Sequence, residues 1–409
     1  MTDSLYVTDG SSAEATPDSV IEFARSLRPR LRDLQSVHEE LGGYTEEIHN
    51  AFLEGGLYRV LQPKRFGGLG FDFETFMRVG IEISRGDPGV GWAYILGSGH
   101  AFHVGSFYGE QAQAELFASD FIAPSRTVPH GRGSKVAGGY QLTGVWDYCS
   151  GSMWSTHALV VAPTFDGEKM IGLKMFAMPR SDYTILDDWG NGETIGMQAS
   201  SSNSIEVKDV FVPEHLVIDY AFREHVLGET GPVGFQLNKA PIYVGRTMTF
   251  FNAELVAAQV GAAWAALDEY EELMRTKSAS FPPRVPRLDT PEYHRWFGKI
   301  RVLTDSSESL LISAVNQYTA LGQHWMDTGE EFTPDQDARL RGIVQQAARL
   351  ANEAVHLAFT TAGTTSAKRG SKMQKYYRDV SMYETHIAAQ WDVTYSSESR
   401  FYFGQELTF

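Results

Sequence analysis

The chain has 409 residues, of which 43% are hydrophobic and 12% are aromatic. This length suggests two or three domains, and the aromatic content excludes a disordered or fibrous chain, in which aromatic residues are scarce. Acidic residues outnumber basic ones by 51 to 35, which gives a formal net charge of −16. Because that charge repels phosphate backbones and anionic headgroups, we expect neither nucleic acid nor a membrane surface as a partner.

The N-terminal segment is polar and acidic, and residues 1–17 are predicted to form a mobile tail. It lacks the basic and apolar segments of a signal peptide, and no run of about 18 apolar residues follows, so neither export nor membrane insertion is expected. The single cysteine, Cys149, cannot form an intrachain disulfide. A reducing, cytoplasmic location is therefore predicted.

The first half of the chain shows two sequence patterns, one after the other. Residues 18–119 contain good helix formers punctuated by glycine pairs, which predicts several short helices. From about residue 120 the pattern changes to short β-branched and alternating runs, and residues 140–148 repeat an apolar or small residue at every second position. Pro213 ends the last of these runs, since proline cannot donate to a strand ladder.

The second half of the chain is predicted to be helical. Apolar periodicity favours four long helices, at residues 251–274, 293–321, 335–363 and 375–397, which suggests a four-helix bundle. The expected fold class is α+β, mostly α, with a helical domain at 1–119, a β domain at 120–219 and a helical bundle at 220–409. No glycine-rich dinucleotide or phosphate loop lies between a strand and a helix, so no nicotinamide site is expected in this chain.

The segment Trp146–Ser152 is the first candidate for chemistry. If the strand runs to its end, Trp146, Tyr148 and Ser150 share one face, and Gly151 lets the backbone approach a neighbour closely. An aromatic floor with a hydroxyl at its edge would suit a flat heteroaromatic ring. The alternative is an ordinary strand whose aromatic residues fill the core and whose Ser-Gly pair makes a turn.

Histidines supply the other candidates. Helical spacing places His386 beside Tyr383 and Ala389, so its imidazole is expected to be partly buried and either structural or an acid–base group near pH 7. Trp92 and His100 lie about two helical turns apart and therefore share one side of a predicted helix.

Metal binding is not expected. His100 and His103 have the spacing of a helical pair, but the sequence lacks the HExxH motif. Two Glu-x-x-His motifs, ending at His49 and His356, match the spacing of di-iron bundles. The predicted strand domain separates them, which makes a shared bundle improbable and leaves di-iron chemistry as a remote alternative.

Taken together, these segments resemble the acyl-CoA dehydrogenase superfamily along nearly the whole chain. The resemblance is closer to the oxygenase components of two-component flavin monooxygenases, the group that contains p-hydroxyphenylacetate hydroxylase. It rests on the order and spacing of residues 55–59 followed by 63–68, residues 138–146, residues 196–203 followed by 209–214, and Arg378-Asp379 followed by His386.

The resemblance implies a fold and a cofactor site. The fold would be a helical domain, a middle antiparallel β-barrel-like domain and a four-helix bundle, assembled as a homotetramer. Reduced FMN or FAD would lie between the β domain and the bundle, with Ser150 facing the flavin N5. Ser125, Thr127 and Tyr148 would line the flavin ring. Thr364 and Ser366 would contact the flavin edge or phosphate, and this contact can cross a subunit boundary.

Within the superfamily the resemblance favours the oxygenases. The Tyr-Glu-Gly-Thr segment typical of acyl-CoA dehydrogenases is absent, and the Arg378-Asp379…His386 pattern stands in its place. The usual Arg-x-x-Phe-Gly segment is also altered, because residues 277–287 are proline-rich and the nearest match is Trp296-Phe297-Gly298. This departure leaves the phosphate ligands, and the choice between FMN and FAD, open.

The reaction implied is hydroxylation of a phenolic substrate, at the ortho carbon, by a flavin C4a-hydroperoxide formed from O2. A separate NAD(P)H:flavin reductase would supply the reduced flavin. His386 would control the proton at the peroxide, His100 and Ser125 would bind the substrate hydroxyl, and Trp92 would form a wall of the substrate pocket. Nitrogen or sulfur oxidation, an acyl-CoA dehydrogenase and a non-catalytic assembly protein remain as alternatives.

Overall fold

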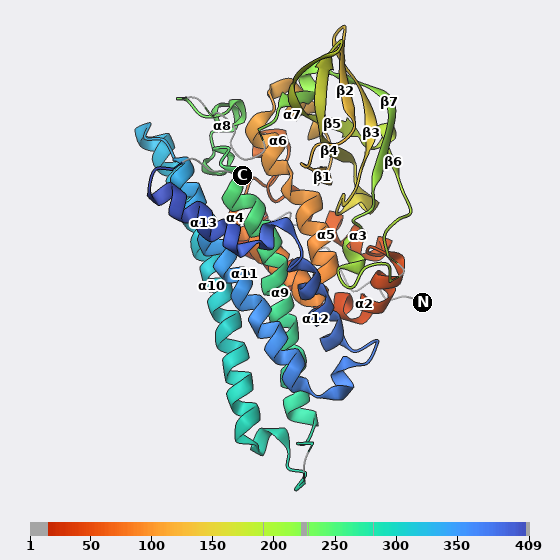
Figure 1. The fold of residues 1–409 in the computed structure, drawn as a ribbon, viewed down its shortest axis with the longest axis vertical. Coiled ribbons are helices and arrows are strands. Elements are labelled where there is room, and N and C mark those ends of the chain that lie inside the picture. Colours follow the sequence, from red (N-terminus) through yellow and green to blue (C-terminus); the bar gives the residue numbers. More distant parts are fainter. Residues whose placement is uncertain (1–14, 191, 222–226, 228, 281, 406–409) are drawn as a thin grey trace.

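The structure is a computed structural model that describes residues 15–190, 192–221, 227, 229–280 and 282–405. Helices form a layer beside the sheet and a long bundle that extends away from it (Figure 1). The tail predicted at residues 1–17 lies almost entirely outside the described residues, and the first helix begins at Pro17.

Seven helices make up the region that precedes the sheet: α1 Pro17–Ser26, α2 Arg28–Leu41, α3 Glu46–Glu54, α4 Phe73–Gly86, α5 Pro88–Gly99, α6 Ala101–Phe107 and α7 Glu110–Leu116. N-cap side chains fix where several of these helices begin. Thr16, Asp72 and Asp87 each accept a hydrogen bond from a backbone N–H in the first turn of α1, α4 and α5. Helix α5 is almost wholly buried, which explains why its sequence is apolar on every side.

The middle region is one eight-stranded sheet: β1 Ser125–Arg126, β2 Arg132–Val136, β3 Gly139–Trp146, β4 His157–Asp166, β5 Lys169–Pro179, β6 Thr184–Ile185, β7 Ile205–Pro213 and β8 Val217–Asp219. The strand order is β6-β7-β3-β2-β4-β5-β8, and β1 pairs with β4. The sheet is mixed, since β4 pairs in parallel with both β1 and β2. The sheet expected to be antiparallel is therefore mixed: the other five strand pairs are antiparallel, and these two are parallel.

The strand that was expected to carry Trp146, Tyr148 and Ser150 on one face ends at Trp146. The Trp146 ring is fully buried and its indole N–H donates to the carbonyl of Val161 at 2.9 Å. Tyr148 has a φ of +53° and is 55% exposed, so the chain turns there and the period-two prediction fails.

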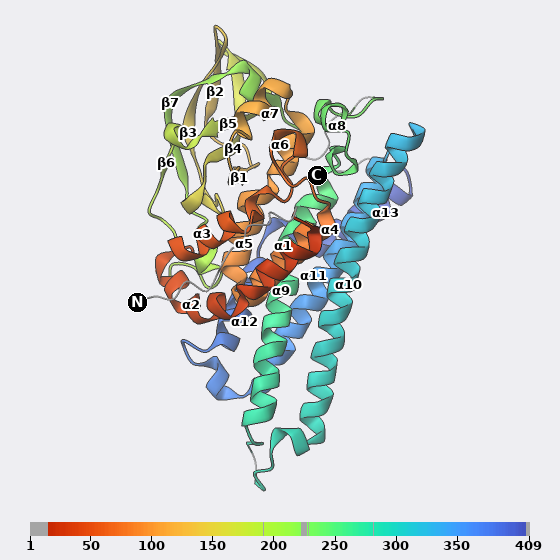
Figure 2. The same ribbon diagram turned by 180° about the vertical axis from the view of Figure 1, so that it is seen from behind.

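The C-terminal region contains α8 Val233–Asn238, α9 Thr247–Thr276, α10 Pro291–Thr328, α11 Pro334–Ala362, α12 Lys372–Tyr383 and α13 Trp391–Tyr402. Helices α9, α10 and α11 correspond to three of the four predicted helices and run side by side in both views (Figures 1 and 2). The fourth prediction was wrong in one respect: residues 375–397 form two helices, with a short 3-10 turn at Ile387–Ala389 between them.

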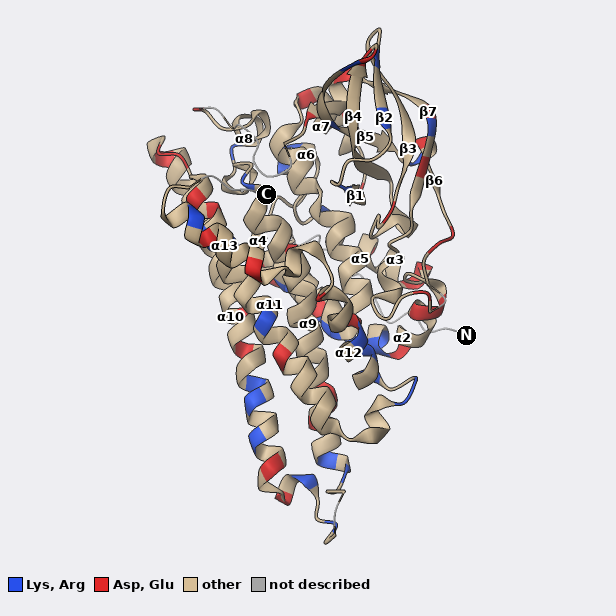
Figure 3. Cartoon of the chain, viewed as in Figure 1, with Lys and Arg blue, Asp and Glu red and all other residues tan. Residues whose placement is uncertain are grey.

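The helices and the sheet share one large buried core, which contains residues from α1 to α7, from the strands and from the upper parts of α9 to α11. A second buried cluster fills the distal part of the bundle. Among the described residues one helix, α9, is long and apolar enough to cross a membrane, but 89% of its apolar window is buried inside the protein. Its composition is therefore that of a core helix. Acidic and basic residues are distributed along the helices and the sheet (Figure 3).

Candidate active site

The turn after β3 brings Ser150 to Trp92. Gly151 has a φ of +80°, and a Cβ added there would meet the carbonyl oxygen of Ala93 at 2.6 Å, so only glycine lets this turn pack against the backbone of α5. The Trp92 indole N–H then donates to Ser150 Oγ at 3.1 Å. Gly151 thus makes the close approach expected from the sequence, and the neighbour that it approaches is a helix.

A second loop completes the surroundings of Ser150. Met197 and Ser201 have φ values of +51° and +49°, which are uncommon for residues with a side chain. The loop lies against the turn because Gly151 N–H donates to the carbonyl of Ser200 at 3.0 Å. Ser202 Oγ lies 2.7 Å from Ser150 Oγ and 2.6 Å from Ser200 Oγ, which forms a row of three hydroxyls. The sequence prediction missed Ser200 and Ser202, although both lie in one of the matching segments.

His386 lies in the connection between α12 and α13, and its ring centroid is 5.9 Å from that of Trp92. The backbone N–H of Ala388 donates to its Nδ1 at 3.1 Å, so Nδ1 carries no proton. Burial, together with the positive charge of Arg126, lowers the pKa of His386 to about 4. At pH 7 the ring is therefore neutral and presents Nε2–H as a donor. Trp92 thus contacts both Ser150 and His386, three residues that the sequence singled out separately.

Arg126 is a charged neighbour that the sequence prediction missed. It follows Ser125 on β1, pairs with Asp147 at 2.9 Å and places its guanidinium 5.7 Å from the ring centroid of Tyr148. The same charge opposes the protonation of His386. Burial raises the pKa of the Cys149 thiol to about 12, which makes this cysteine unreactive at neutral pH.

His100 lies at the junction of α5 and α6 and is 5% exposed. Its Nδ1 is 2.8 Å from the carbonyl of Ala123, so Nδ1 carries the proton and donates. Burial lowers the pKa of His100 to about 4, and the neutral ring therefore keeps an unprotonated Nε2. The Ala123 contact also anchors the segment that leads to Ser125, whose buried Oγ has no hydrogen-bond partner among the described residues.

Thr127, Thr364 and Ser366, which were also predicted to contact the cofactor, are not linked to Trp92 or Ser150 by any contact described above. Thr127 hydrogen-bonds to Tyr220 through its side chain. Thr364 is exposed and Ser366 is buried in a 3-10 turn, Thr364–Ala367, at the end of α11 remote from the sheet (Figure 1). The described residues of a single chain therefore do not bring Thr364 and Ser366 to Ser150.

The two Glu-x-x-His motifs have separate partners. His49 bonds to the hydroxyl of Tyr58 at 2.9 Å and stacks on Trp154. His356 lies 3.7 Å from Glu384. Within the described ranges no group of three or more His, Cys, Asp and Glu side chains could hold a metal ion.

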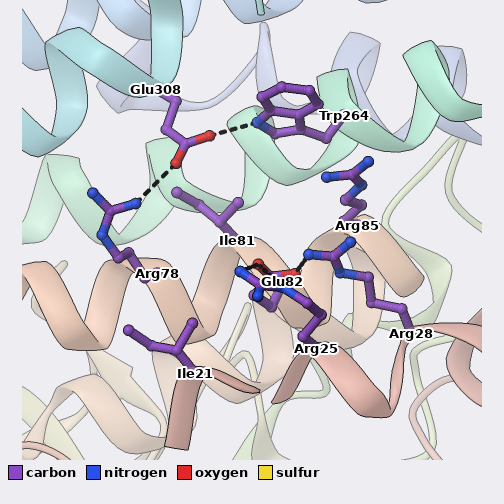
Figure 4. Close-up of a pocket in the computed structure, with 9 residues that line it drawn as sticks. All are labelled: Ile21, Arg25, Arg28, Arg78, Ile81, Glu82, Arg85, Trp264 and Glu308. Atoms are coloured by element: carbon purple, nitrogen blue, oxygen red, sulfur yellow. Dashed lines mark hydrogen bonds and ion pairs between the residues drawn. The ribbon is translucent and has the colours of Figure 1, made fainter. Parts of the chain in front are cut away.

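A cavity of about 310 Å³ is lined by residues of α1, α2, α4, α9 and α10, and none of the predicted site residues is among them (Figure 4). Its lining is rich in arginines, but each is ion-paired: Arg25 and Arg28 with Glu82, Arg78 with Glu308, and Arg85 with Asp268. Trp264 N–H also donates to Glu308. The arginines of this cavity are thus already engaged by carboxylates, and we do not assign the flavin to it.

Comparisons with known proteins place the chain in a family. Residues 11–123 match the N-terminal domain, and residues 253–391 the C-terminal domain, of acyl-CoA dehydrogenase. The chain is 27% identical to the flavin-dependent monooxygenase oxygenase subunit HsaA of Rhodococcus jostii, over 89% of this chain and 92% of the relative. It is 24% identical to the p-hydroxyphenylacetate 3-hydroxylase oxygenase component of Acinetobacter baumannii, over 95% and 90% of the two chains.

The crystal structure of 3-HSA hydroxylase from a Rhodococcus species superposes with a TM-score of 0.85 at 26% identity, covering 96% of this chain and 98% of that chain. Both terminal regions thus match acyl-CoA dehydrogenase domains, while the relatives named above that span nearly the full length are flavin-dependent monooxygenases and hydroxylases. The chain therefore belongs to the acyl-CoA dehydrogenase superfamily and, within it, to the flavin-dependent monooxygenases.

Proposed function

We propose that this protein is the oxygenase component of a two-component flavin monooxygenase that hydroxylates a phenolic substrate at the ortho carbon. A separate NAD(P)H:flavin reductase would supply reduced FMN or FAD. The observation that carries the proposal is the contact of Trp92 with both Ser150 and His386. It joins an α5 side chain, the turn after β3 and the α12–α13 connection into one site.

The residues around this contact fit a flavin. Ser125 has a buried hydroxyl without a partner, Ser150 has a hydroxyl at the edge of the site, and Tyr148 presents an exposed ring beside Arg126. Ser125, Thr127, Tyr148 and Ser150 would hold the isoalloxazine. When bound in its reduced form, the flavin supplies the activation of O2 that the reaction requires.

His100 would orient the substrate hydroxyl. Its Nε2 lone pair can accept a hydrogen bond from a phenol, which increases the electron density of the ring at the carbon next to the hydroxyl. Ser125 would make the second contact with the same hydroxyl. Trp92 is 7% exposed and would form an apolar wall that excludes water.

His386 would have the complementary role at the oxygen that is transferred. Because its Nδ1 accepts from a backbone N–H, only Nε2–H is free to donate. A neutral donor can hold a hydrogen bond to an oxygen atom without releasing its proton early. Arg126 supports this state, since its charge disfavours the imidazolium form.

Thr364 and Ser366 would serve the site of another subunit. They lie at the end of α11, remote from Ser150, so a contact with flavin requires a second copy of the chain in a homotetramer. We also propose a cytoplasmic location, where a reductase can deliver free reduced flavin.

The test is an oxygen-coupling assay. The full chain is mixed with chemically reduced FMN or FAD, a set of simple phenols and O2, and the hydroxylated product is measured against O2 consumed and hydrogen peroxide released. We expect ortho-hydroxylated product in a large fraction of the turnovers for at least one phenol. Oxidation only of amines or thioethers, or dehydrogenation of acyl-CoA esters, would assign the site to one of the other reactions.

A further inference from the structure

Two residues interrupt the otherwise buried stretches of α5 and α9 beside His100. Leu96 is the one residue of α5 that is not buried, and Phe251 is the one such residue between Thr249 and Ala263 on α9. His100 follows Leu96 by about one helical turn, and its ring centroid lies 6.2 Å from that of Phe251. The accessible apolar surface of Leu96 and Phe251 therefore adjoins the histidine proposed to bind the substrate hydroxyl.

The carboxyl of Glu254 lies between these two residues. A Cβ added at Gly99 would meet Glu254 Oε2 at 2.5 Å, so the carboxyl occupies room that the glycine leaves free. The ring centroid of Phe102, in α6, lies 6.2 Å from that of Phe251. Residue numbers thus rise along α5 and α6 as they fall along α9, which means that the two segments run antiparallel. Leu96, one turn before Gly99, is therefore on the opposite side of Glu254 from Phe251.

Glu254 Oε2 is buried and has no hydrogen-bond partner among the described residues. The whole residue is 2% exposed. Burial raises the pKa of the carboxyl well above its usual range, and in the described part of the chain no nearby cation offsets this effect. At pH 7 the group is therefore a neutral acid, which has one O–H to donate and a carbonyl oxygen to accept. Because an unpaired buried polar group costs free energy, the carboxyl is suited to a polar atom of a bound molecule.

We propose that Glu254 is a substrate-binding residue whose carboxyl hydrogen-bonds to an uncharged hydroxyl or carbonyl group that the phenol carries besides its reacting hydroxyl. This inference rests on the proposed function, in which His100 orients the reacting hydroxyl. Leu96 and Phe251 would pack against the hydrocarbon part of the same substituent. A charged substituent is disfavoured. A carboxylate would find no cation beside the neutral acid, and an ammonium would require Glu254 to ionise in apolar surroundings.

Replacing Glu254 by leucine should remove a preference between substrates. With wild type, a phenol that carries an alkyl group leaves the acid without a partner, whereas the matching alcohol supplies one. An unpaired buried group weakens binding by about five- to a hundredfold. We therefore expect wild type to bind the alcohol about tenfold more tightly than the alkylphenol. E254L should bind the two equally, and E254Q, whose amide also donates and accepts, should keep most of the preference.

The experiment measures dissociation constants of phenols for the full chain with reduced flavin bound, under anaerobic conditions that prevent turnover. The probes are the meta and para isomers of hydroxybenzyl alcohol, each paired with the ethylphenol of the same geometry, and tyramine as a phenol with an ammonium group. G99A is a second test, because its added methyl group would displace the carboxyl without removing it. We expect G99A to show a smaller preference for the alcohol than wild type.

Q259L is the matched control. Gln259 also lies on α9, is fully buried, and has two side-chain polar atoms without a hydrogen-bond partner among the described residues. It is five residues beyond Glu254 and therefore points about 140° away around the helix. We expect Q259L to change stability and to keep the wild-type preference.

Infrared difference spectra give a direct readout of the contact. The carbonyl stretch of a protonated carboxyl at this position is present in wild type and absent from E254Q. We expect this band to shift when the alcohol binds to wild type and to stay in place when the ethylphenol binds.

The possible failures give different results. Equal affinities of wild type for each alcohol and its ethylphenol, or the same preference in E254L as in wild type, would show that Glu254 does not bind the substituent. Tighter binding of tyramine than of the alcohols, lost in E254L, would make Glu254 an ion-pairing residue and overturn the inference. If E254L does not fold, an unchanged preference in G99A together with an unshifted infrared band overturns it. If wild type binds neither reduced flavin nor any phenol, the proposed function itself fails.

Discussion

His100 and His386 are neutral for the same reason, and yet their Nε2 atoms have opposite hydrogen-bonding roles. Burial lowers the pKa of both to about 4. His100 uses Nδ1–H to hold the Ala123 carbonyl, which leaves an acceptor at Nε2. His386 uses its Nδ1 lone pair to hold the Ala388 N–H, which leaves a donor. A single backbone contact thus selects the tautomer of each ring.

His100→Asn tests the acceptor. The asparagine amide can keep a donor near the position of Nδ1, and thus the contact with Ala123, but it has no acceptor where Nε2 lies. Because general-base contributions are about 10²- to 10⁴-fold, we expect kcat/KM for the phenol to fall by about a hundredfold or more. The fraction of consumed O2 that is released as hydrogen peroxide should rise as the product yield falls. The affinity for reduced flavin should stay close to that of wild type.

His157→Asn is the matched control for this change. His157 is also a mostly buried histidine whose pKa burial lowers to about 4, and it bonds to the Thr156 hydroxyl at 2.9 Å. Its replacement should lower stability without changing the fraction of O2 that appears in product. Equal product yields in His100→Asn and wild type would show that His100 does not orient the substrate.

Helix α12 holds the elements of the site together through one buried lysine. Lys375 is 3% exposed, and its Nζ lies 2.7 Å from Asp379 and 3.0 Å from Asp87. Each carboxylate also accepts a backbone hydrogen bond, Asp379 from Met197 N–H and Asp87 from Gly89 N–H. One cation therefore connects α12, the start of α5 and the serine-bearing loop.

Lys375→Met should be strongly destabilising, because it leaves two carboxylates buried without their counter-ion. A broken buried ion pair costs about 3–5 kcal/mol in the free energy of unfolding. In the double variant Lys375→Met with Asp379→Asn, one of those charges is removed and the amide oxygen can still accept from Met197. We expect the double variant to recover part of the loss, as measured by urea unfolding.

The double-mutant cycle gives the control for this prediction. Asp379→Asn alone removes a partner of Lys375 but leaves Asp87 paired with it, so its cost should be smaller than that of Lys375→Met. Strict additivity of the two single changes would mean that Lys375 and Asp379 do not stabilise one another.

Acid sensitivity is a property of the whole molecule, because buried neutral histidines occur in all three of its regions. His100 belongs to the N-terminal helices, His157 to β4 and His386 to the C-terminal region. Burial lowers the pKa of each to about 4. The pKa of Glu254 on α9 is shifted in the opposite direction. Glu254 is 2% exposed, and burial raises the pKa of its carboxyl well above its usual range.

The sign of each contribution follows from proton binding. Below about pH 6.5 the unfolded chain protonates the three histidines and the folded protein does not, so their stabilising contribution is lost as the pH falls toward 4. Glu254 stays protonated in the fold, so its contribution is present below about pH 4.5 and is lost as the pH rises. Between about pH 4.5 and pH 6.5, acidification therefore lowers the stability of the fold through the histidines and raises it through Glu254.

Glu254→Gln separates the two effects, since it removes the carboxyl and keeps the shape of the side chain. We expect the variant to be more stable than wild type at pH 7.5 and to show no such gain at pH 4.5. Its stability should fall more steeply on acidification, because the histidines are no longer opposed by Glu254; each ionisable group contributes up to about 1.4 kcal/mol per pH unit. Urea midpoints measured at constant ionic strength from pH 4.5 to 7.5 check this. Parallel curves for the two proteins would contradict it.

The sequence alone determined the order of helices and strands, three of the four long helices, and Ser150, Trp92, His100 and His386 as candidates. Such features depend on local periodicity, on turn residues and on motifs that each occupy a short stretch of chain. The break after Tyr383 has no glycine or proline to mark it. It depends on His386, whose side chain takes a backbone N–H that a continuous helix would use.

Only the tertiary structure decided the rest. The mixed sheet, the tautomers of His100 and His386, the charge of Arg126 beside the site and the row from Ser150 to Ser200 all depend on groups that are far apart in the sequence. Hydrogen-bond direction and protonation depend on which groups meet in a buried space, and that is set by packing between elements. For this reason the sequence could name candidate residues but could not assign whether each of them donates or accepts a hydrogen bond.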